Sequence, residues 1–140
     1  MNIALIGYGK MGHTIERLAP TRGHRIATTI DVDNHEAAFA SDTFRHADVA
    51  IEFTGPQTAY DNILRCLRAG LPVVSGSTGW TARMDELKAH CHELSGAFFY
   101  ASNFSLGMNL FFAINDRLAQ LMNAYPNYDV SLTETHHIHK

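Results

Sequence analysis

Titratable side chains are concentrated near the end of the sequence, in the run Glu134-Thr135-His136-His137-Ile138-His139-Lys140. Imidazole titrates near neutral pH, so such a cluster can transfer protons or bind a metal ion. If the segment is a strand, His137 and His139 share one face, but no cysteine or further cluster of acids completes a zinc site. The residue types therefore favour proton transfer, and no metal site is expected.

A second group of residues forms the pattern G-x-G-x-x-G, from Gly7 to Gly12. It follows the apolar run at residues 2–6, which is typical of a buried strand, and it opens a helical segment at residues 11–18. In that context the glycines permit a tight turn, close approach of a pyrophosphate to the backbone, and close packing of helix on strand. The free N–H groups at the start of the helix favour phosphate. The pattern predicts a dinucleotide-binding turn.

An acidic residue that could contact the ribose of a dinucleotide ends the next predicted strand. Asp31 lies 19 residues after Gly12 and directly follows residues 25–30. Its carboxylate could accept hydrogen bonds from the ribose hydroxyls, and its charge would repel a 2′-phosphate, although an aspartate is also common in plain turns. Val32 follows it where an arginine would favour NADPH, whereas Lys10 could partly neutralise a 2′-phosphate. Asp31 therefore predicts NADH as the preferred cofactor over NADPH.

Three further predicted strands end in small and polar residues. The loops at residues 53–56, 75–79 and 101–105 have the sequences FTGP, SGSTG and ASNFS. Small residues let backbone groups reach a ligand, and Ser, Thr and Asn both donate and accept hydrogen bonds. Any one of these segments could be an ordinary loop or a helix cap. Ligands of open parallel sheets, however, bind at the carboxyl ends of the strands, so the joint position of the loops predicts one shared site.

The elements that position these residues alternate along the chain. Short apolar or β-branched runs predict strands at residues 2–6, 25–30, 49–53, 72–75 and 97–101. Helical spacing of apolar residues predicts helices at residues 11–18, 34–40, 57–69, 81–94 and 105–122. Repeated strand–helix units predict an α/β fold, a Rossmann-type doubly wound parallel sheet with helices on both faces.

The residues after Pro126 predict a different architecture. Tyr128, Val130 and Leu132 alternate with polar residues, which is typical of a half-buried strand at residues 128–135. We therefore expect residues 1–126 to form a dinucleotide-binding domain. Residues 127–140 are expected to begin an incomplete α+β substrate and tetramerisation domain, with this strand as its first element.

Composition narrows the class of partner. Hydrophobic residues make up 46% and charged residues 18% of the 140 residues, as in ordinary soluble globular proteins. A net charge of -3 with scattered Lys and Arg argues against nucleic acid, and no apolar run has the length of a membrane span. Cys66 and Cys91 lack a paired spacing and are expected to be reduced thiols on helices of a cytoplasmic protein. The expected partner is a small molecule, with neither nucleic acid nor membrane.

Together these motifs resemble the dihydrodipicolinate reductase family, which makes tetrahydrodipicolinate for diaminopimelate and lysine biosynthesis. Besides the glycine turn, four family motifs have counterparts in order. They are D-V-x-I-D-F-T-x-P at residues 48–56, with Glu52 at the second aspartate, V-x-G-T-T-G at residues 74–79, A-x-N-F-S-x-G at residues 101–107 and E-x-H-H-x-x-K at residues 134–140. The resemblance implies an oxidoreductase that uses NADH or NADPH to reduce 4-hydroxy-tetrahydrodipicolinate, a dicarboxylate. It also implies a homotetramer.

The resemblance implies a role for each matching residue. His136 is implied as the catalytic acid/base and Lys140 as the proton donor. His137 is implied to bind a carboxylate of the substrate, with Thr78 near the substrate. The residues implied to bind the cofactor are Gly7, Tyr8, Gly9, Lys10, Met11, Gly12 and Asp31 at the adenosine and pyrophosphate, and Gly76, Ser77, Thr78, Ala101, Ser102, Asn103 and Phe104 at the nicotinamide. His139 has no implied role.

The chain also departs from the family pattern. The glycine turn is one residue shorter, Ser77 replaces the first Thr of V-x-G-T-T-G but keeps its hydroxyl, and the acid-then-Arg pair of the family is Asp31-Val32. The family has a substrate domain beyond the H-H-x-x-K motif, including a P-S-G-T segment. We therefore expect this chain to be truncated after that motif and to lack full activity.

Two other functions remain open on the sequence alone. A non-catalytic dinucleotide-binding or redox-sensing module would carry the same glycine turn. Dehydrogenases that act on aspartate or homoserine have a related architecture, but the H-H-x-x-K ending argues against them.

Overall fold

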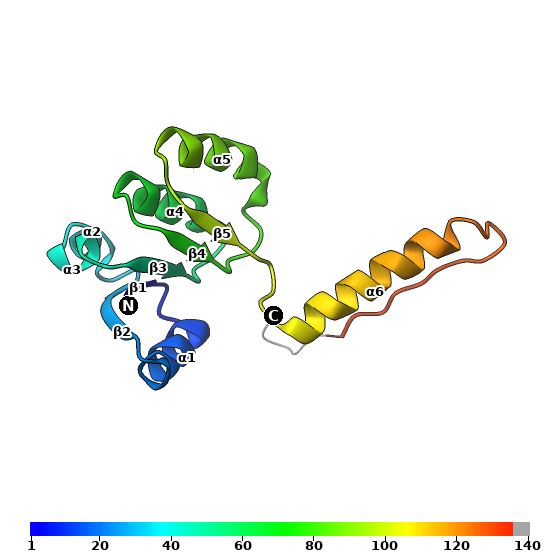
Figure 1. The fold of residues 1–140 in the computed structure, drawn as a ribbon, viewed down its shortest axis with the longest axis horizontal. Coiled ribbons are helices and arrows are strands. Elements are labelled where there is room, and N and C mark those ends of the chain that lie inside the picture. The colour runs from blue at the N-terminus through cyan, green and yellow to red at the C-terminus, as the bar shows by residue number, and fades with distance from the viewer. Residues whose placement is uncertain (136–140) are drawn as a thin grey trace. The chain divides into compact units, whose positions relative to one another are not determined.

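The computed structural model describes residues 1–135, and the chain forms two compact units. The first unit is Met1–Ser102, and the second begins at Asn103. The first unit carries the sheet, and the second carries one long helix (Figure 1). Most of the loops predicted to bind a ligand therefore belong to the first unit.

The five predicted parallel strands form one sheet with the order β2-β1-β3-β4-β5. Their bounds are β1 (Asn2–Ile6), β2 (Arg25–Ile30), β3 (Val49–Glu52), β4 (Val73–Ser75) and β5 (Phe98–Tyr100). The first strand, β1, pairs in parallel with both β2 and β3. The chain thus starts in the interior of the sheet, builds first to one side and then to the other (Figure 1). This confirms the predicted doubly wound fold and puts its switch point between β1 and β3.

Helices connect these strands. Their bounds are α1 (Lys10–Leu18), α2 (His35–Phe39), α3 (Asp42–Arg45), α4 (Ala59–Arg68) and α5 (Met84–Glu93), with short 3-10 turns η1 (Pro20–Arg22) and η2 (Thr81–Arg83). Because β1-α1-β2 and β3-α4-β4 run in opposite directions along the sheet, right-handed crossovers place α1 and α4 on opposite faces.

Two helix starts differ from the sequence-based expectation. The expected helix at residues 81–94 begins as the 3-10 turn η2, and the α-helix α5 follows it from Met84. The short helix α3 was not predicted. Ser41 begins it by accepting a hydrogen bond from the Phe44 N–H at 3.2 Å, which satisfies one of the free donors at a helix start.

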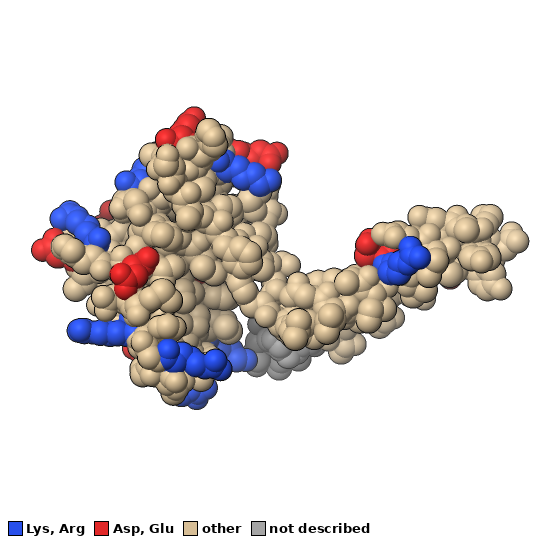
Figure 2. Space-filling model, in the orientation of Figure 1, with Lys and Arg blue, Asp and Glu red and all other residues tan. Residues whose placement is uncertain are grey.

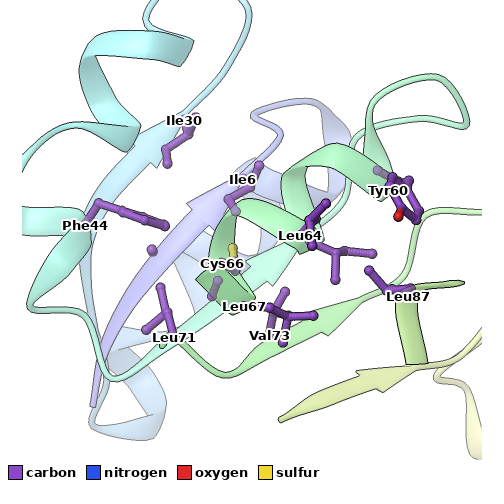
Figure 3. Close-up of a cluster of buried hydrophobic side chains, with 14 of the residues drawn as sticks. Ile6, Ile30, Phe44, Tyr60, Leu64, Cys66, Leu67, Leu71, Val73 and Leu87 are labelled. Atoms are coloured by element: carbon purple, nitrogen blue, oxygen red, sulfur yellow. The ribbon is translucent and has the colours of Figure 1, made fainter. Parts of the chain in front are cut away.

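The main core lies between one face of the sheet and the helices α2 to α5 (Figure 3). Ala4 and Ile6 of β1 belong to this cluster and are at most 1% exposed. The helices contribute Ala38, Phe44, Ala59, Tyr60, Ile63, Leu64, Cys66, Leu67 and Leu87. Ile3 and Leu5 are also buried but lie outside the cluster, because successive side chains of a strand point to opposite faces. Burial on both faces explains why β1 is apolar from Ile3 to Ile6.

One charged cluster joins α4 to the start of α5. Glu86 accepts hydrogen bonds from the Tyr60 hydroxyl at 2.7 Å and from Arg83 Nη2 and Nε at 2.7 and 2.8 Å. The Arg83 guanidinium also lies over the Tyr60 ring, 3.4 Å from its centroid, in a cation–π contact. Hydrogen bonds from Arg83 and then from Tyr60 lower the pKa of Glu86 to about 2. The ionised form of Glu86 therefore bridges the two helices.

The second unit consists of α6 (Leu106–Met122) and the segment that follows it. Ser105 begins the helix by accepting a hydrogen bond from the Met108 N–H at 3.4 Å. The expected helix at residues 105–122 is therefore formed, with Gly107 inside it. Its exposed apolar side chains, each at least 44% exposed, are Leu106, Leu110, Phe111, Phe112, Ile114, Leu118 and Leu121.

The predicted strand at residues 128–135 is not formed. The segment has no regular secondary structure, and Tyr128, Val130 and Leu132 are between 64% and 69% exposed instead of half-buried. Alternation indicates which residues share a face, but a strand also needs a neighbouring strand for its backbone hydrogen bonds. Within residues 1–135 no strand pairs with this segment. The expected domain boundary after residue 126 stays a prediction.

Charged side chains are dispersed over the first unit. Figure 2 shows basic and acidic side chains interspersed on the visible face of the molecule, without a basic stripe. On α6 the charged residues are Asp116 and Arg117. Of the helices in the described part of the chain, none combines the length and apolar character needed to cross a bilayer.

The two cysteines are free thiols on α4 and α5, as expected. Burial raises the pKa of Cys66 to about 12, so its thiol stays protonated and unreactive at neutral pH.

Leu87→Ala should lower the free energy of unfolding by about 2–5 kcal/mol, because Leu87 is fully buried and its removal leaves a cavity. Leu94→Ala is the matched control near the end of the same helix, where the side chain is 43% exposed, and should cost less than about 1 kcal/mol. Urea titration measures both. Equal losses for the two variants would contradict the placement of the core.

The Glu86 cluster should make stability depend on pH in the acid range. The pKa of Glu86 is about 2 in the folded protein and 4.5 ordinarily. The ionised carboxylate therefore stabilises the folded state fully above pH 4.5, and this stabilisation is lost as the pH falls towards 2. Glu86→Gln should be less stable than the wild type at pH 7 and should lose less stability between pH 4.5 and 2. Tyr60→Phe, which removes one hydrogen bond to Glu86, should show an intermediate slope. Melting temperatures measured across this range test the prediction, and an unchanged slope in Glu86→Gln would contradict it.

Candidate functional site

Loops from three neighbouring strands surround a cavity of about 350 Å³ at the carboxyl edge of the sheet. The cavity lies at the switch point between β1 and β3, where ligands of doubly wound sheets bind, and its volume is in the range of small-ligand pockets. Its lining residues are Ile6, Gly7, Tyr8, Gly9, Ile30, Asp31, Val32, His35, Phe53, Thr54, Gly55, Thr58 and Asn62. The structure thus brings together the predicted glycine turn, the predicted acid and the loop after β3.

Two glycines of the turn pack against the protein itself. Gly7 has a φ of +91°, and a Cβ atom on it would lie 2.1 Å from the carbonyl oxygen of Phe53. A Cβ atom on Gly12 would lie 2.4 Å from the carbonyl oxygen of Gly7. Both positions therefore require glycine so that strand, turn and helix can approach closely, whether or not a ligand is bound.

Gly9 is different, because open space lies above it. Its φ of -80° suits any residue, and no heavy atom beyond its chain neighbours lies within 4 Å of an ideal Cβ position. It is the N-cap of α1, without a side-chain cap and without an acidic residue in the first turn. The free N–H groups of this helix start therefore face a space that a phosphate could fill.

The carboxylate of Asp31 is available to a ligand. Within residues 1–135 it has no hydrogen-bond or ion-pair partner, whereas the backbone N–H of Asp31 donates to Asn34 Oδ1 at 2.8 Å. The Asn34 side chain also donates to the carbonyl oxygen of Thr29 at 2.9 Å, which fixes the turn after β2. The described lining of the cavity contains no Lys or Arg, and Lys10 is exposed outside it.

A polar wall of the cavity was not predicted. His35 Nε2 lies 2.9 Å from Asn62 Oδ1, and Asn62 Nδ2 donates to Thr54 Oγ1 at 3.3 Å. His35 Nδ1 lies 3.1 Å from Glu36, which also pairs with Arg65 at 2.7 and 3.0 Å. Hydrogen bonds from Arg65 and then from His35 lower the pKa of Glu36 to about 2. The available sequence signal was Asn62 itself, a polar residue on the apolar face of α4.

A buried acid next to the cavity was also missed. Glu52, the last residue of β3, is fully buried, and its carboxylate accepts hydrogen bonds from the N–H and the hydroxyl of Thr54 and from the hydroxyls of Ser75 and Ser77. A buried carboxylate is costly unless donors surround it, and these residues supply them. An acid at the end of an otherwise apolar strand was the signal that could have indicated it.

The predicted loop after β4 is held against the loop after β3. Ser77 is 5% exposed, and its hydroxyl oxygen accepts from the Thr54 N–H at 2.8 Å and donates to Glu52 at 2.8 Å. The Trp80 indole N–H donates to the Ser77 carbonyl oxygen at 2.8 Å. The hydroxyl of Ser77 is therefore already engaged inside the protein, whereas Thr78 is exposed.

The remaining residues predicted to bind the cofactor are placed as follows. Tyr8 lines the cavity, with its hydroxyl donating to Glu16 and its ring 4.1 Å from the His13 ring. That hydrogen bond raises the pKa of Tyr8. Met11 is exposed.

The residues predicted near the end of β5 are divided between the two units. Ala101 and Ser102 follow β5 in the first unit, with the Ala101 N–H donating to the Ser75 carbonyl oxygen at 3.3 Å. Asn103 and Phe104 begin the second unit.

The predicted catalytic and substrate residues at the end of the chain, His136, His137 and Lys140, lie outside the described residues. His139 does so as well. In the part of the chain that the structure describes, no group of three or more His, Cys, Asp or Glu side chains is placed to hold a metal ion.

Known proteins resemble this chain in sequence and in fold. Residues 1–104 match the family model described as "Dihydrodipicolinate reductase, N-terminus". The 4-hydroxy-tetrahydrodipicolinate reductase of Christiangramia forsetii is 44% identical over 142 residues, which cover 100% of this chain and 57% of the relative. The enzyme of the same name from Chromobacterium violaceum is 33% identical over 158 residues, with coverages of 97% and 57%. This chain thus spans 57% of the length of each relative.

Solved structures share the fold of the first unit. Biliverdin reductase from Synechocystis sp. PCC 6803, in complex with biliverdin and NADP+, superposes with a TM-score of 0.55 at 15% sequence identity. The superposition covers 71% of this chain and 37% of that chain. At this identity the likeness concerns the fold alone.

Substitution of Gly9 should mainly weaken ligand binding, whereas substitution of Gly7 should mainly lower stability. Gly9→Ala should change the free energy of unfolding by less than about 1 kcal/mol but weaken NADH binding roughly tenfold or more, because the methyl group enters the open space above the turn. Gly7→Ala should cost about 2 kcal/mol or more in stability, because its Cβ would overlap the Phe53 carbonyl. Urea unfolding and fluorescence titration with NADH separate the two effects. Unchanged NADH affinity in Gly9→Ala would contradict the assignment of the space above Gly9.

Proposed function

The chain belongs to the dihydrodipicolinate reductase family, whose N-terminal model matches residues 1–104, and from this premise we propose that it takes part in the NADH- or NADPH-dependent reduction of 4-hydroxy-tetrahydrodipicolinate to tetrahydrodipicolinate. This reaction belongs to diaminopimelate and lysine biosynthesis. The observation that carries the proposal is the cavity at the switch point, with open space over Gly9 and an Asp31 carboxylate that has no partner among residues 1–135. This chain covers 57% of the length of the first relative. The assignment of the relative's complete reaction to this chain is therefore part of the proposal.

The cavity fits the adenosine and pyrophosphate part of a pyridine nucleotide. In the proposal, the pyrophosphate lies over Gly9 at the start of α1, and the Asp31 carboxylate accepts hydrogen bonds from the ribose hydroxyls. The nucleotide makes apolar contacts with Ile6, Val32 and Phe53, which line the cavity. The bound nucleotide supplies the hydride of the reaction, and the residues of the chain bind, orient and protonate.

NADH is the proposed preferred cofactor. The Asp31 charge repels a 2′-phosphate, and the described lining of the cavity offers no Lys or Arg to neutralise it. Lys10 lies on the exposed start of α1 outside the lining, which supports the same preference.

Proton transfer and substrate binding are proposed for the end of the chain. His136 acts as the acid/base and Lys140 as the proton donor, and general acid–base catalysis by such groups contributes about 10²–10⁴-fold in rate. His137 and Thr78 bind the substrate, whose two carboxylates suit charge-assisted hydrogen bonds from a cationic cluster. The loops that follow β4 and β5 are proposed to contact the nicotinamide.

The proposal includes the partners that the family resemblance implies. The substrate is a small dicarboxylate, and the assembly is a homotetramer. A cytoplasmic location is supported by the two free thiols, since reducing compartments keep cysteines in this form.

Cofactor preference tests the role of Asp31. The chain should bind NADH at least about fivefold more tightly than NADPH, and Asp31→Asn should bring the two dissociation constants close to each other, because the substitution removes the charge that repels a 2′-phosphate. Asp33→Asn, the same substitution at an exposed position two residues away, should keep the wild-type ratio. Calorimetric titration with both nucleotides measures the constants.

Three outcomes would each contradict part of the proposal. A wild-type chain that binds neither nucleotide would exclude the proposed function, whereas tighter binding of NADPH would exclude only the cofactor preference. Oxidation of NADH after addition of 4-hydroxy-tetrahydrodipicolinate follows the reaction itself. Turnover that persists unchanged in His136→Ala would contradict the role given to His136.

A further inference from the structure

The buried carboxylate of Glu52 connects two loops that end at the candidate site. Thr54, in the loop after β3, donates to Oε1 through its N–H at 2.9 Å and also through its hydroxyl. Ser77, in the loop after β4, donates to the same oxygen at 2.8 Å. Ser75 donates to Oε2, so both carboxylate oxygens are engaged. The two loops are therefore held by one acid that a ligand cannot contact directly, because Glu52 is fully buried.

Ser77 reinforces this connection in both directions. Its hydroxyl oxygen also accepts from the Thr54 N–H at 2.8 Å, and its carbonyl oxygen accepts from the Trp80 indole at 2.8 Å. Next to it, a Cβ on Gly76 would lie 2.1 Å from the ring of Phe53, so the two loops are in close contact. A shift of Ser77 would therefore move the loop at residues 76–79, which does not line the cavity, relative to Phe53 and Thr54.

The sizes of Glu52 and Ser77 are complementary. Both side chains are enclosed, because Glu52 is fully buried and Ser77 is 5% exposed, and the Ser77 hydroxyl lies 2.8 Å from Glu52 Oε1. Glutamate is longer than aspartate by one methylene, and serine is smaller than threonine by one methyl. A shorter acid at position 52 together with a larger hydroxyl residue at position 77 would therefore nearly preserve the buried volume. Volume-conserving changes are the ones that a close-packed interior tolerates best.

We propose that Glu52 and Ser77 form a positioning pair, in which the length of the acid and the size of the hydroxyl residue together set the place of the loop at residues 76–79 against the loop at residues 53–56. Since the proposed function puts the nicotinamide at the loop after β4, the pair sets affinity for the nicotinamide end of the cofactor and not for its adenosine end. Neither residue needs to touch the substrate.

A double-mutant cycle tests the pair in the 140-residue chain, with Glu52→Asp, Ser77→Thr and the double variant. Glu52→Asp withdraws the carboxylate from its donors by about 1.5 Å, the length of one carbon–carbon bond, and Ser77→Thr adds a methyl group to a full space. Each single variant should bind NADH roughly tenfold more weakly, while its affinity for ADP-ribose, which lacks the nicotinamide, should stay within about twofold. The double variant should recover NADH affinity to within about threefold of the wild type.

Thermal unfolding provides a second cycle that needs no cofactor. Each single substitution should lower the melting temperature by about 3 °C or more, and the double variant should lower it by less than the sum of the two. Glu93→Asp and Ser131→Thr, the same chemical changes at exposed positions, are the matched controls and should leave both measurements unchanged.

The outcomes separate this proposal from the proposed function. Additive losses in both cycles would overturn the pair, as would equal weakening of NADH and ADP-ribose binding in the single variants. If the wild type binds neither ligand, the proposed function fails, and the thermal cycle alone decides whether the two residues are coupled. Coupling in the thermal cycle without any effect on NADH would overturn the positioning role and leave only a packing role.

Discussion

A carboxylate that is removed from water must be surrounded by hydrogen-bond donors, and the arrangement of this sheet edge depends on meeting that requirement for Glu52. The donors come from the loop after β3 and from the end of β4 and its loop. Any structure that satisfies Glu52 therefore brings the carboxyl ends of these two strands into register. The cavity is lined by one of the loops that this requirement positions. The edge of the sheet that carries the candidate site is thus held together by a buried residue that a ligand cannot contact directly.

The glycine turn shows that a sequence pattern can predict a binding site without indicating which of its residues serve packing and which serve binding. G-x-G-x-x-G indicates a turn that binds a dinucleotide, but the pattern does not distinguish the roles of its three glycines. The structure distinguishes them, because Gly7 and Gly12 are fixed by close contacts within the protein, and only the space above Gly9 is open. Packing and binding thus make separate demands on one short segment. Gly7 and Gly12 allow the close packing of strand, turn and helix, and Gly9 leaves space for a ligand.

Much of the fold could be predicted from the sequence because its signals are local. Each strand and each long helix is indicated by the spacing of its own residues, and Asp31 is indicated by its distance from the turn. The polar wall and the Glu52 cluster could not be found in this way. His35 contacts Asn62 from 27 residues away, and Glu52 contacts Ser77 from 25 residues away, so neither pair has a local spacing. The strand expected at residues 128–135 failed for a related reason, since alternation at Tyr128 and Val130 does not provide a pairing partner.

The position of β1 in the sheet has a consequence for biosynthesis. Of the five strands of the sheet, β1 is synthesised first, yet it occupies an interior position and pairs with both β2 and β3. One edge of β1 can pair only after β2 (Arg25–Ile30) has been synthesised. The other edge can pair only after β3 (Val49–Glu52) has been synthesised. An apolar segment that cannot pair immediately is exposed to misassociation during this interval. One edge of β1 therefore stays unpaired until β3 has been synthesised about fifty residues later, which takes a few seconds at typical elongation rates.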